Sequence, residues 1–244
     1  MKSDGVLVFL VLASAGCASL EGPPFAAYDP FEPANVRSYA VSEWIDGNAL
    51  RPVARGYQAV TWGWFRTGVG NVFANLRELD SALNGYLQLK PERGFTSLVR
   101  ILVNTSIGLG GWFDVAARTG LTDPEEDFGQ TLAVAGVTRT RYLYIPVLGP
   151  SSARDLPGSL FRALLPRLLL GAYYPWWIAA LDGINSRAAA LTLSDARDTL
   201  ALDPYVFTRE AFYQRRKFLI FDGHPPREDP FAAFDEFEAT DDVD

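Results

Sequence analysis

Residues 69–87 read VGNVFANLRELDSALNGYL, and this stretch decides the fold class. Its apolar side chains recur at steps of three and four, which places them on one face of an α-helix. The dipeptide Lys90-Pro91 that follows is predicted to end the helix, because proline cannot continue a helix from within. The apolar positions are Val69, Val72, Phe73, Leu76, Leu79, Leu83, Tyr86 and Leu87.

Similar spacing outside this stretch predicts further helices, and only one segment departs from it. In residues 131–147, the apolar runs TLAVAGV and YLYIPV flank TRTR, which predicts a β-hairpin. The 16 prolines and 21 glycines predict short or interrupted helices. The fold class is therefore mainly α, with short amphipathic helices and at most one small hairpin. The further helices are predicted at 95–103, 114–118, 186–202 and 208–220.

The most unusual segment is 163–181, ALLPRLLLGAYYPWWIAAL, in which Arg167 is the only charge. Pro166 and Pro175 should interrupt or bend a helix there. Two interpretations stay open: a buried core helix, or a bent helix or hairpin that lies within lipid. A true span is disfavoured, because two prolines and a central arginine are costly in hydrocarbon. The candidate lipid-contacting residues are Leu168, Trp176, Trp177 and Ile178.

Aromatic side chains gather at two places along the chain. Tyr173, Tyr174, Trp176 and Trp177 surround Pro175. A second cluster, WGWF at 62–65, precedes the helix quoted above and is expected to begin it. Tyrosine and tryptophan prefer the headgroup level of a membrane, where both ring and polar edge are satisfied. Both clusters are compatible with a protein at a membrane interface.

Charge and composition exclude several classes of function. Residues 222–244 hold nine acids and one base, whereas the rest holds 20 acids and 21 bases, so the acidity is confined to a tail. Without a basic stripe, nucleic-acid binding is set aside. One cysteine and one histidine exclude a Cys/His metal site, a disulfide framework and a CxxC redox centre, and no cofactor is expected.

Three motifs were weighed for chemistry, and each has a more ordinary interpretation. His224 lies in GHPP without an accompanying GxSxG, so a serine hydrolase triad is disfavoured. The carboxylates at 125–127 are more typical of a helix cap or a solvated face than of acid–base catalysis. The string SIGLGG at 106–111 fails as a nucleotide loop and indicates tight backbone packing before a short helix.

The N-terminus is typical of a bacterial lipoprotein signal. Residues 1–16 combine Lys2, an apolar run and small residues, and SAGC places the lone thiol, Cys17, where a lipobox cysteine receives diacylglycerol. Alanine rather than aspartate at position 18 favours forwarding to the outer membrane. The alternative is a plain secretory signal with a free cysteine. The expected organisation is a signal at 1–16, a lipidated tether at 17–27, one domain at 28–223 and an acidic tail at 224–244.

Seven strings in order resemble the MlaA/VacJ lipoprotein family over about residues 28–223. The stretch NVRSYAVSEWIDG at 35–47 and Leu79 depart from the family's usual pattern. The strings are YDPFEPAN (28–35), LRPVARGY (50–57), FRTGVGNVFANLRE (65–78), VNTSIGLGGWFDVAARTGL (103–121), EEDFGQTLAVAGV (125–137), YLYIPVLGPSSARD (142–155) and DPYVFTREAFYQRRKFLIFDG (203–223).

The resemblance implies a helical ring in the inner leaflet of the outer membrane, with a central amphipathic channel for phospholipid headgroups. Such proteins associate with trimeric porins, pass lipid to a periplasmic carrier and remove misplaced phospholipid from the outer leaflet. It implies a passive conduit rather than an enzyme. The alternatives are a structural lipoprotein that binds porins and, less favoured, an envelope lipid hydrolase. Candidate channel-lining residues are Arg100, Arg118, Arg141 and Arg154.

We expect the mature protein to begin with an acylated Cys17, because only a thiol can form the thioether of a lipoprotein anchor. Mass spectrometry of protein extracted from membranes should find diacylglycerol on this residue. The variant Cys17→Ser, which keeps the size but loses the thiol, should be released into the periplasmic fraction. An unmodified thiol at position 17 of the mature chain would contradict the prediction.

Overall fold

Proline sets the beginning of many helices in the computed structural model, which describes residues 28–226. It occupies the first or second position of five helices, where its missing N–H has no intrahelical partner to lose. Cys17, the predicted signal and tether, and the tail beyond residue 226 lie outside the described residues. The elements are α2 (Glu32–Ile45), the π-helix η1 (Asp46–Leu50), α3 (Arg51–Val60), α4 (Gly63–Leu87), α5 (Pro91–Ser106), α6 (Val115–Arg118), α7 (Phe128–Val134), β1 (Tyr142–Ile145), β2 (Gly149–Ser152), α8 (Leu156–Leu170), the 3-10 helix η2 (Gly171–Tyr173), α9 (Trp176–Leu200) and α10 (Pro204–Ile220).

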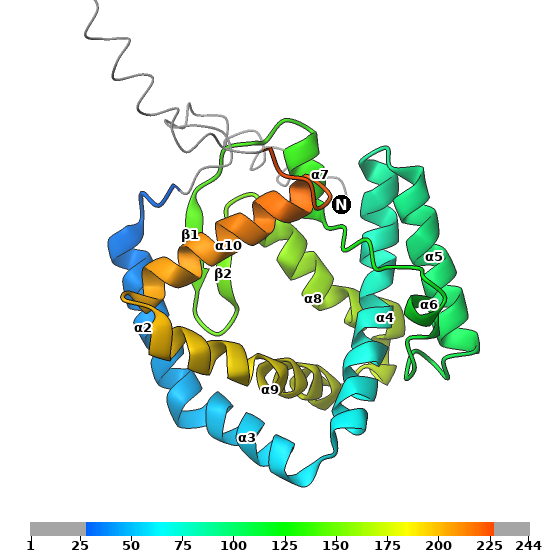
Figure 1. The fold of residues 1–244 in the computed structure, drawn as a ribbon, viewed down its shortest axis with the longest axis horizontal. Coiled ribbons are helices and arrows are strands. Elements are labelled where there is room, and N and C mark those ends of the chain that lie inside the picture. The colour runs from blue at the N-terminus through cyan, green and yellow to red at the C-terminus, as the bar shows by residue number, and fades with distance from the viewer. Residues whose placement is uncertain (1–27, 227–244) are drawn as a thin grey trace, which may run out of the picture.

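The helices are arranged as a ring rather than around one central core (Figure 1). The run α2, η1 and α3 follows one side, α4 turns away from it, and α8, α9 and α10 complete the circuit, with α5 packed outside α4. The mainly α prediction is confirmed. The helices predicted at 69–87, 95–103, 114–118, 186–202 and 208–220 all form, most of them longer than the pattern indicated.

A tyrosine cluster closes the ring where its beginning and end meet. Tyr142, Tyr144, Tyr205 and Tyr213 pack together from the hairpin and α10. The Tyr142 amide donates to the Tyr28 carbonyl at 2.9 Å, and the Tyr213 hydroxyl donates to the same carbonyl at 3.2 Å. These contacts join the first described residues to the hairpin and to the last helix.

The β-hairpin exists, but the prediction placed one of its strands wrongly. The segment TLAVAGV belongs to α7 and the turn after it, because Asp127 caps that helix by accepting from the Gln130 amide at 2.9 Å. The helix ends before Gly136, whose φ is +103°. The strand β1 pairs instead with β2, with Tyr142 opposite Ser152. A strand of sequence GPSS has no apolar alternation and was therefore not recognisable.

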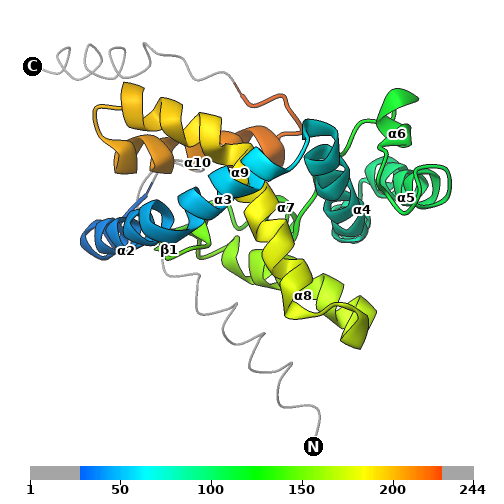
Figure 2. The same ribbon diagram turned by 90° about the horizontal axis from the view of Figure 1, so that it is seen from below.

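The apolar segment 163–181 is broken into two helices joined by η2. Pro166 stays inside α8, whereas Pro175 occupies the N-cap of α9, so only the second proline marks a boundary. Figure 2 shows α8 and the beginning of α9 extending beyond the other helices on one side of the ring. The backbone is thus interrupted in this segment, while contact of the segment with lipid stays a prediction. No helix within residues 28–226 is long and apolar enough to cross a bilayer.

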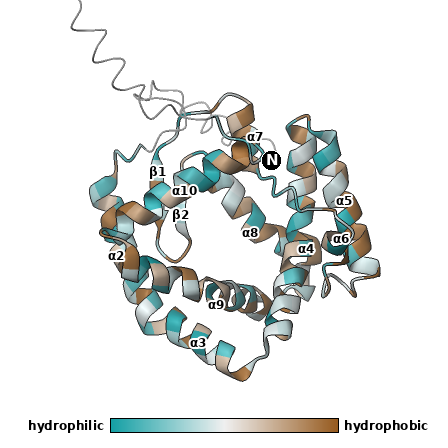
Figure 3. Cartoon of the chain, in the orientation of Figure 1, coloured by the Kyte–Doolittle hydropathy of each residue, from teal (hydrophilic) through white to brown (hydrophobic). Residues whose placement is uncertain are grey.

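Polar groups are buried and apolar groups are exposed to an unusual degree. Among the described residues, 20 polar or charged residues are buried against 15 hydrophobic ones. Many leucines, tryptophans and phenylalanines face outward, and apolar and polar segments alternate along the same helices (Figure 3). In a water-soluble protein both features would be unfavourable, and a large exposed apolar surface indicates contact with a membrane or another protein.

Glycines allow a close contact between the backbones of α4 and α5. A Cβ at Gly85 would lie 2.6 Å from the Gly94 amide nitrogen, and a Cβ at Gly94 would lie 2.8 Å from the Tyr86 ring. The predicted packing role of SIGLGG is also confirmed. A Cβ at Gly108 would lie 2.3 Å from the Phe113 carbonyl oxygen, and Gly111, at φ +91°, abuts Asn75.

We expect Arg100→Gln to destabilise the protein by about 3–5 kcal/mol, because it strands the buried Glu78 carboxylate without its partner. Thermal and denaturant unfolding in detergent would measure the change. The matched control Arg118→Gln, at an exposed arginine, should change stability by less than about 0.5 kcal/mol. The double variant Glu78→Gln/Arg100→Gln should recover part of the loss. Equal stability of Arg100→Gln and wild type would contradict the assigned role.

Candidate functional site

Two adjoining cavities lie between α4, α8, α9 and α10. Their volumes are about 250 and 460 Å³, and they share Arg77, Asp127, Ser159 and Arg162 in their walls. We call them together the polar cavity. Because the shared residues line both spaces, the smaller space, next to α9, adjoins the larger one, next to α10.

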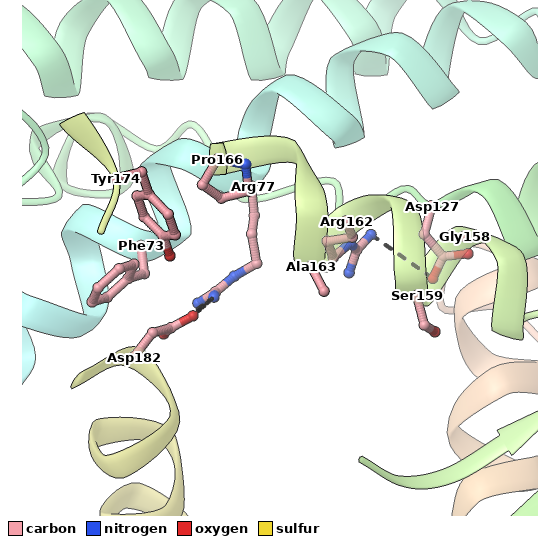
Figure 4. A pocket seen from close by; sticks show the side chains of 10 residues that line it. All are labelled: Phe73, Arg77, Asp127, Gly158, Ser159, Arg162, Ala163, Pro166, Tyr174 and Asp182. Atoms are coloured by element: carbon pink, nitrogen blue, oxygen red, sulfur yellow. Dashed lines mark hydrogen bonds and ion pairs between the residues drawn. The ribbon is translucent and has the colours of Figure 1, made fainter. Parts of the chain in front are cut away.

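The smaller part of the polar cavity is lined by both apolar and charged side chains (Figure 4). Apolar Phe73, Pro166 and Tyr174 and charged Arg77 and Asp182 lie together at one end of this space, and Arg162 lies toward Asp127 at the other end. Phe73 and Tyr174 are buried and pack with Val69, so these two residues are also part of the core. An amphipathic molecule could therefore contact apolar and charged side chains within one space.

Arg216 is the best-compensated cation of the cavity wall. Its Nη1 donates to Asp127 at 2.6 Å, and its Nη2 donates to Asp127 at 3.0 Å and to Asp155 at 2.9 Å. Burial alone would raise the pKa of Asp127, but the hydrogen bond and charge of Arg216 outweigh it and hold the pKa at about 2. Burial acts to lower the pKa of Arg216, and the two carboxylates raise it above its ordinary value. Asp127 and Arg216 are therefore both charged at physiological pH.

Arg77 and Arg162 enter the same space from two different helices. Arg77, on α4, points toward Asp182 of α9, and Arg162 projects from α8 (Figure 4). Arg162 donates through Nε to the buried Asp80 at 2.7 Å and through Nη2 to the Glu126 carbonyl at 3.0 Å. Burial raises the pKa of Asp80, and the charge of Arg162 acts in the opposite direction.

The four arginines that the sequence suggested as channel-lining lie in different parts of the structure. Arg100 is buried between α4 and α5 and pairs with Glu78 and Asp114. Arg154 is buried and pairs with Asp155 at 3.0 Å. Both are internal partners of carboxylates here, and neither lines the polar cavity.

The other two arginines lie nearer the surface and also outside the polar cavity. Arg118 is exposed at a separate cavity of about 350 Å³ that is lined by Trp64 and Trp112. Arg141 is half-buried in the segment before β1. Sequence reasoning missed Arg77 and Arg162. Arg77 lies on the polar side of the helix predicted at 69–87, and this position is the sequence feature that could have identified it.

The aromatic and apolar residues around Pro175 divide into an exposed and an inward-facing group. Leu168, Trp176 and Trp177 are exposed, with Trp176 at 81%. Ile178 instead packs against the core cluster of Val69, Phe73 and Tyr174, so its placement does not support lipid contact. Tyr174 is buried as well, whereas Tyr173 is 89% exposed, so the predicted headgroup-level cluster is only partly exposed.

A second exposed aromatic group stands where α3 meets α4. Trp62 and Trp64 stack with ring centroids 6.1 Å apart, and both are more than half exposed. Trp112 and Phe65 complete the group through edge-to-face contacts. Gly68 makes this possible, because a Cβ there would lie 2.3 Å from the Trp112 ring. The sequence prediction that this cluster begins a helix is confirmed.

The carboxylates at 125–127 have structural partners. Glu126 is fully buried and accepts from Gln88 at 2.7 Å, while Asp127 caps α7 and binds Arg216. Glu125 is exposed and pairs with Arg215 at 2.9 Å. His224 is exposed and contacts the Asp222 carbonyl. The sequence favoured a helix cap or a solvated face for this acidic run, and Asp127 is the residue that caps α7.

Comparison with known proteins gives consistent matches. The family model described as MlaA lipoprotein matches residues 27–219. The intermembrane phospholipid transport system lipoprotein MlaA of Shigella flexneri is 33% identical over 227 residues, covering 89% of this chain and 88% of its own. That of Escherichia coli strain K12 is 32% identical over 227 residues, covering the same shares. An uncharacterized protein of Rickettsia bellii is 35% identical over 197 residues, covering 78% of this chain and 76% of its own.

A solved structure supports the same relationship at the level of the fold. It is described as "Structural basis for maintenance of bacterial outer membrane lipid asymmetry" and superposes with a TM-score of 0.68 at 31% identity. The match covers 80% of this chain and 99% of the other. With the family model spanning most of the chain, this protein belongs to the MlaA lipoprotein family.

Proposed function

We propose that the protein is an outer-membrane lipoprotein of a Gram-negative bacterium that forms a passive conduit for phospholipids. In this role it removes phospholipid from the outer leaflet and passes it toward the periplasm, which maintains lipid asymmetry. Family membership supports the proposal, because the relatives are named as lipoproteins of intermembrane phospholipid transport. We also propose that Cys17 carries the lipid anchor.

The observation that carries the proposal is a charged cavity within a ring that exposes many large apolar side chains. A headgroup that crosses the apolar part of a leaflet loses its hydration, and each unsatisfied polar group there costs several kcal/mol. The charged side chains of the polar cavity can replace that lost hydration. The exposed apolar surface lets the same molecule sit in hydrocarbon.

The projecting end of α8 and α9 sets the proposed depth in the membrane. Leu164, Leu168 and Leu169 on α8 and Trp176 on α9 are each more than half exposed. A helix of 15 residues is about 22 Å long, and one leaflet contributes about 15 Å of hydrocarbon. A tilted α8 therefore suits immersion in the inner leaflet without reaching the other side. Several acyl chains on Cys17 would hold the ring there.

Two partners follow from the proposed path of the lipid. Lipid from the outer leaflet has to reach the ring along a protein surface, which a porin trimer beside it would provide. Lipid that leaves toward the periplasm needs a soluble carrier of the Mla type to shield its chains. Both are proposals that extend the association of the family with phospholipid transport.

The runner-up is a structural envelope lipoprotein that binds porins without conducting lipid. The exposed apolar surface suits such a role equally well, but the charged cavity would then have no purpose. An envelope lipid hydrolase is less favoured, because the carboxylates at 125–127 are held in a helix cap and ion pairs.

A nitroxide at Leu168 should report apolar surroundings in bilayers, because this side chain is exposed on the projecting end. Collision with oxygen should dominate over collision with a water-soluble nickel chelate. Leu202 is the matched control, because it is also exposed but follows the far end of α9, a helix of 25 residues that is about 37 Å long and begins at the projecting end. A label at Ile178 should report the same protein contacts in detergent and bilayer. Equal nickel access at Leu168 and Leu202 would contradict the proposed depth.

We expect the purified protein in liposomes to speed phospholipid transfer to an acceptor carrier in both directions without nucleotide. A passive conduit lowers the barrier and leaves the equilibrium unchanged. The measurement is exchange of fluorescent phospholipid, with protein-free liposomes as the blank. One-way transfer by this protein alone would contradict the passive mechanism. A deletion strain with unchanged outer-leaflet phospholipid would favour the structural alternative.

A further inference from the structure

Resting on the proposed function, we infer that Arg77 and Arg162 together bind the phosphodiester of a zwitterionic phospholipid headgroup. Asp182 is the counter-ion of Arg77 in the empty site and receives the headgroup ammonium when lipid is bound. The inference names the ligand group and the residues that hold it inside the polar cavity.

The position of the two arginines is the first argument. Arg77 comes from α4 and Arg162 from α8, and both line the smaller and the larger space of the polar cavity. The two arginines therefore line the junction between these spaces, which a headgroup would pass on its way from one space to the other. Arginine is suited to the task, because its planar fork of donors matches the oxygens of a phosphate.

Arg77 is held loosely, which leaves it able to change partners. Only its Nη1 contacts Asp182, at 3.1 Å to Oδ2 and 3.4 Å to Oδ1, and the side chains are 38% and 26% exposed. A one-nitrogen, partly solvated ion pair contributes little to stability. A phosphodiester can therefore take over Arg77 with little loss to the fold.

Arg162 is held firmly on one edge and is open on the other. Its Nε and Nη2 are engaged by Asp80 and by the Glu126 carbonyl, which fix the plane of the guanidinium. Asp80 is 1% exposed, whereas the Arg162 side chain is 33% exposed. The group is thus oriented in advance and still reaches the cavity, as a preorganised binding group requires.

The neighbouring Arg216 cannot fill this role. It is bound at short distance by Asp127 and Asp155, and it is buried, so a ligand would have to break two buried ion pairs. Arg77, with its loose ion pair, is therefore the residue that exchanges partners, and Arg162 is the residue whose contacts stay fixed.

Asp182 argues for a zwitterionic headgroup. When the phosphodiester occupies Arg77, the Asp182 carboxylate loses its ion pair with Arg77 and remains in the same cavity wall. A headgroup ammonium would replace that cation, so the exchange keeps every charge paired. An anionic lipid offers no such replacement and should bind less well.

The experiment measures transfer of phosphatidylethanolamine and of diacylglycerol with identical acyl chains, from liposomes to an acceptor. The protein is the full lipidated chain, as wild type, Arg77→Gln/Arg162→Gln, Asp182→Asn and the control Arg55→Gln. Arg55 is an exposed arginine on α3 that pairs with Asp195 and does not line the polar cavity. Unfolding temperature and circular dichroism establish that each variant folds, and Arg77→Gln alone replaces the double variant if that one does not.

We expect phosphatidylethanolamine transfer to fall about tenfold in the double variant, since two charge-assisted contacts are lost, with diacylglycerol transfer unchanged. Asp182→Asn should abolish the preference for phosphatidylethanolamine over phosphatidylglycerol. Equal loss for both lipids, or no loss for phosphatidylethanolamine, would overturn the inference. A wild type that transfers neither lipid would contradict the proposed function itself.

A final measurement distinguishes a lipid headgroup from free phosphate as the ligand of the two arginines. Inorganic phosphate at millimolar concentration should neither raise the unfolding temperature of the wild type nor slow phosphatidylethanolamine transfer. Saturable stabilisation by phosphate that is lost in the double variant, with lipid transfer unaffected, would assign the two arginines to a free anion and overturn the headgroup assignment.

Discussion

The clamp of Arg216 by Asp127 and Asp155 is the interaction on which the closed ring depends. It joins α10 to the cap of α7 and to the segment between β2 and α8, three parts of the chain that are far apart in sequence. Gly129 is required beside it, because a Cβ there would lie 2.1 Å from an Asp155 oxygen. A thin ring has little interior, so such polar contacts take over part of the role of an apolar core. In the proposed position within a leaflet, the surrounding lipid is as apolar as leucine, so the hydrophobic effect does not drive the helices together.

The small interior of the ring also explains why glycines occur where its helices make contact. Where polar contacts and van der Waals packing hold helices together, close approach of backbones increases both. The contact of Gly85 with Gly94 brings α4 and α5 together, and Gly68 admits Trp112 against α4. Around them lies the buried polar set of Glu78, Arg100 and Ser97. The wall thus buries polar side chains between its helices while many large apolar side chains stay exposed on α4 and α5.

The sequence pattern did not predict α2, α3 or α7, and it predicted α4, α5, α6, α9 and α10 because a helix with one apolar face has the same pattern whichever way that face points. For the same reason it could not identify the arginines of the cavity. Arg100 and Arg77 occupy similar helical patterns, but Arg100 finds Glu78 across the α4–α5 contact, while Arg77 faces Asp182 from a distant helix. Which arginine is buried depends on contacts between helices, and these are invisible in the spacing. The β2 strand was missed because its pairing, and not its composition, makes it a strand.

Burial decides which ion pairs can take part in transport. Pairs such as Arg100 with Glu78 are almost fully buried, and separating them would strand charge in a medium of low dielectric constant. Pairs such as Arg77 with Asp182 are partly solvated, and water compensates their separation. A conduit without an energy source must exchange contacts of nearly equal free energy, because any deep minimum would trap the lipid. The division between closed structural pairs and open exchangeable pairs is therefore what a passive path for charged headgroups requires.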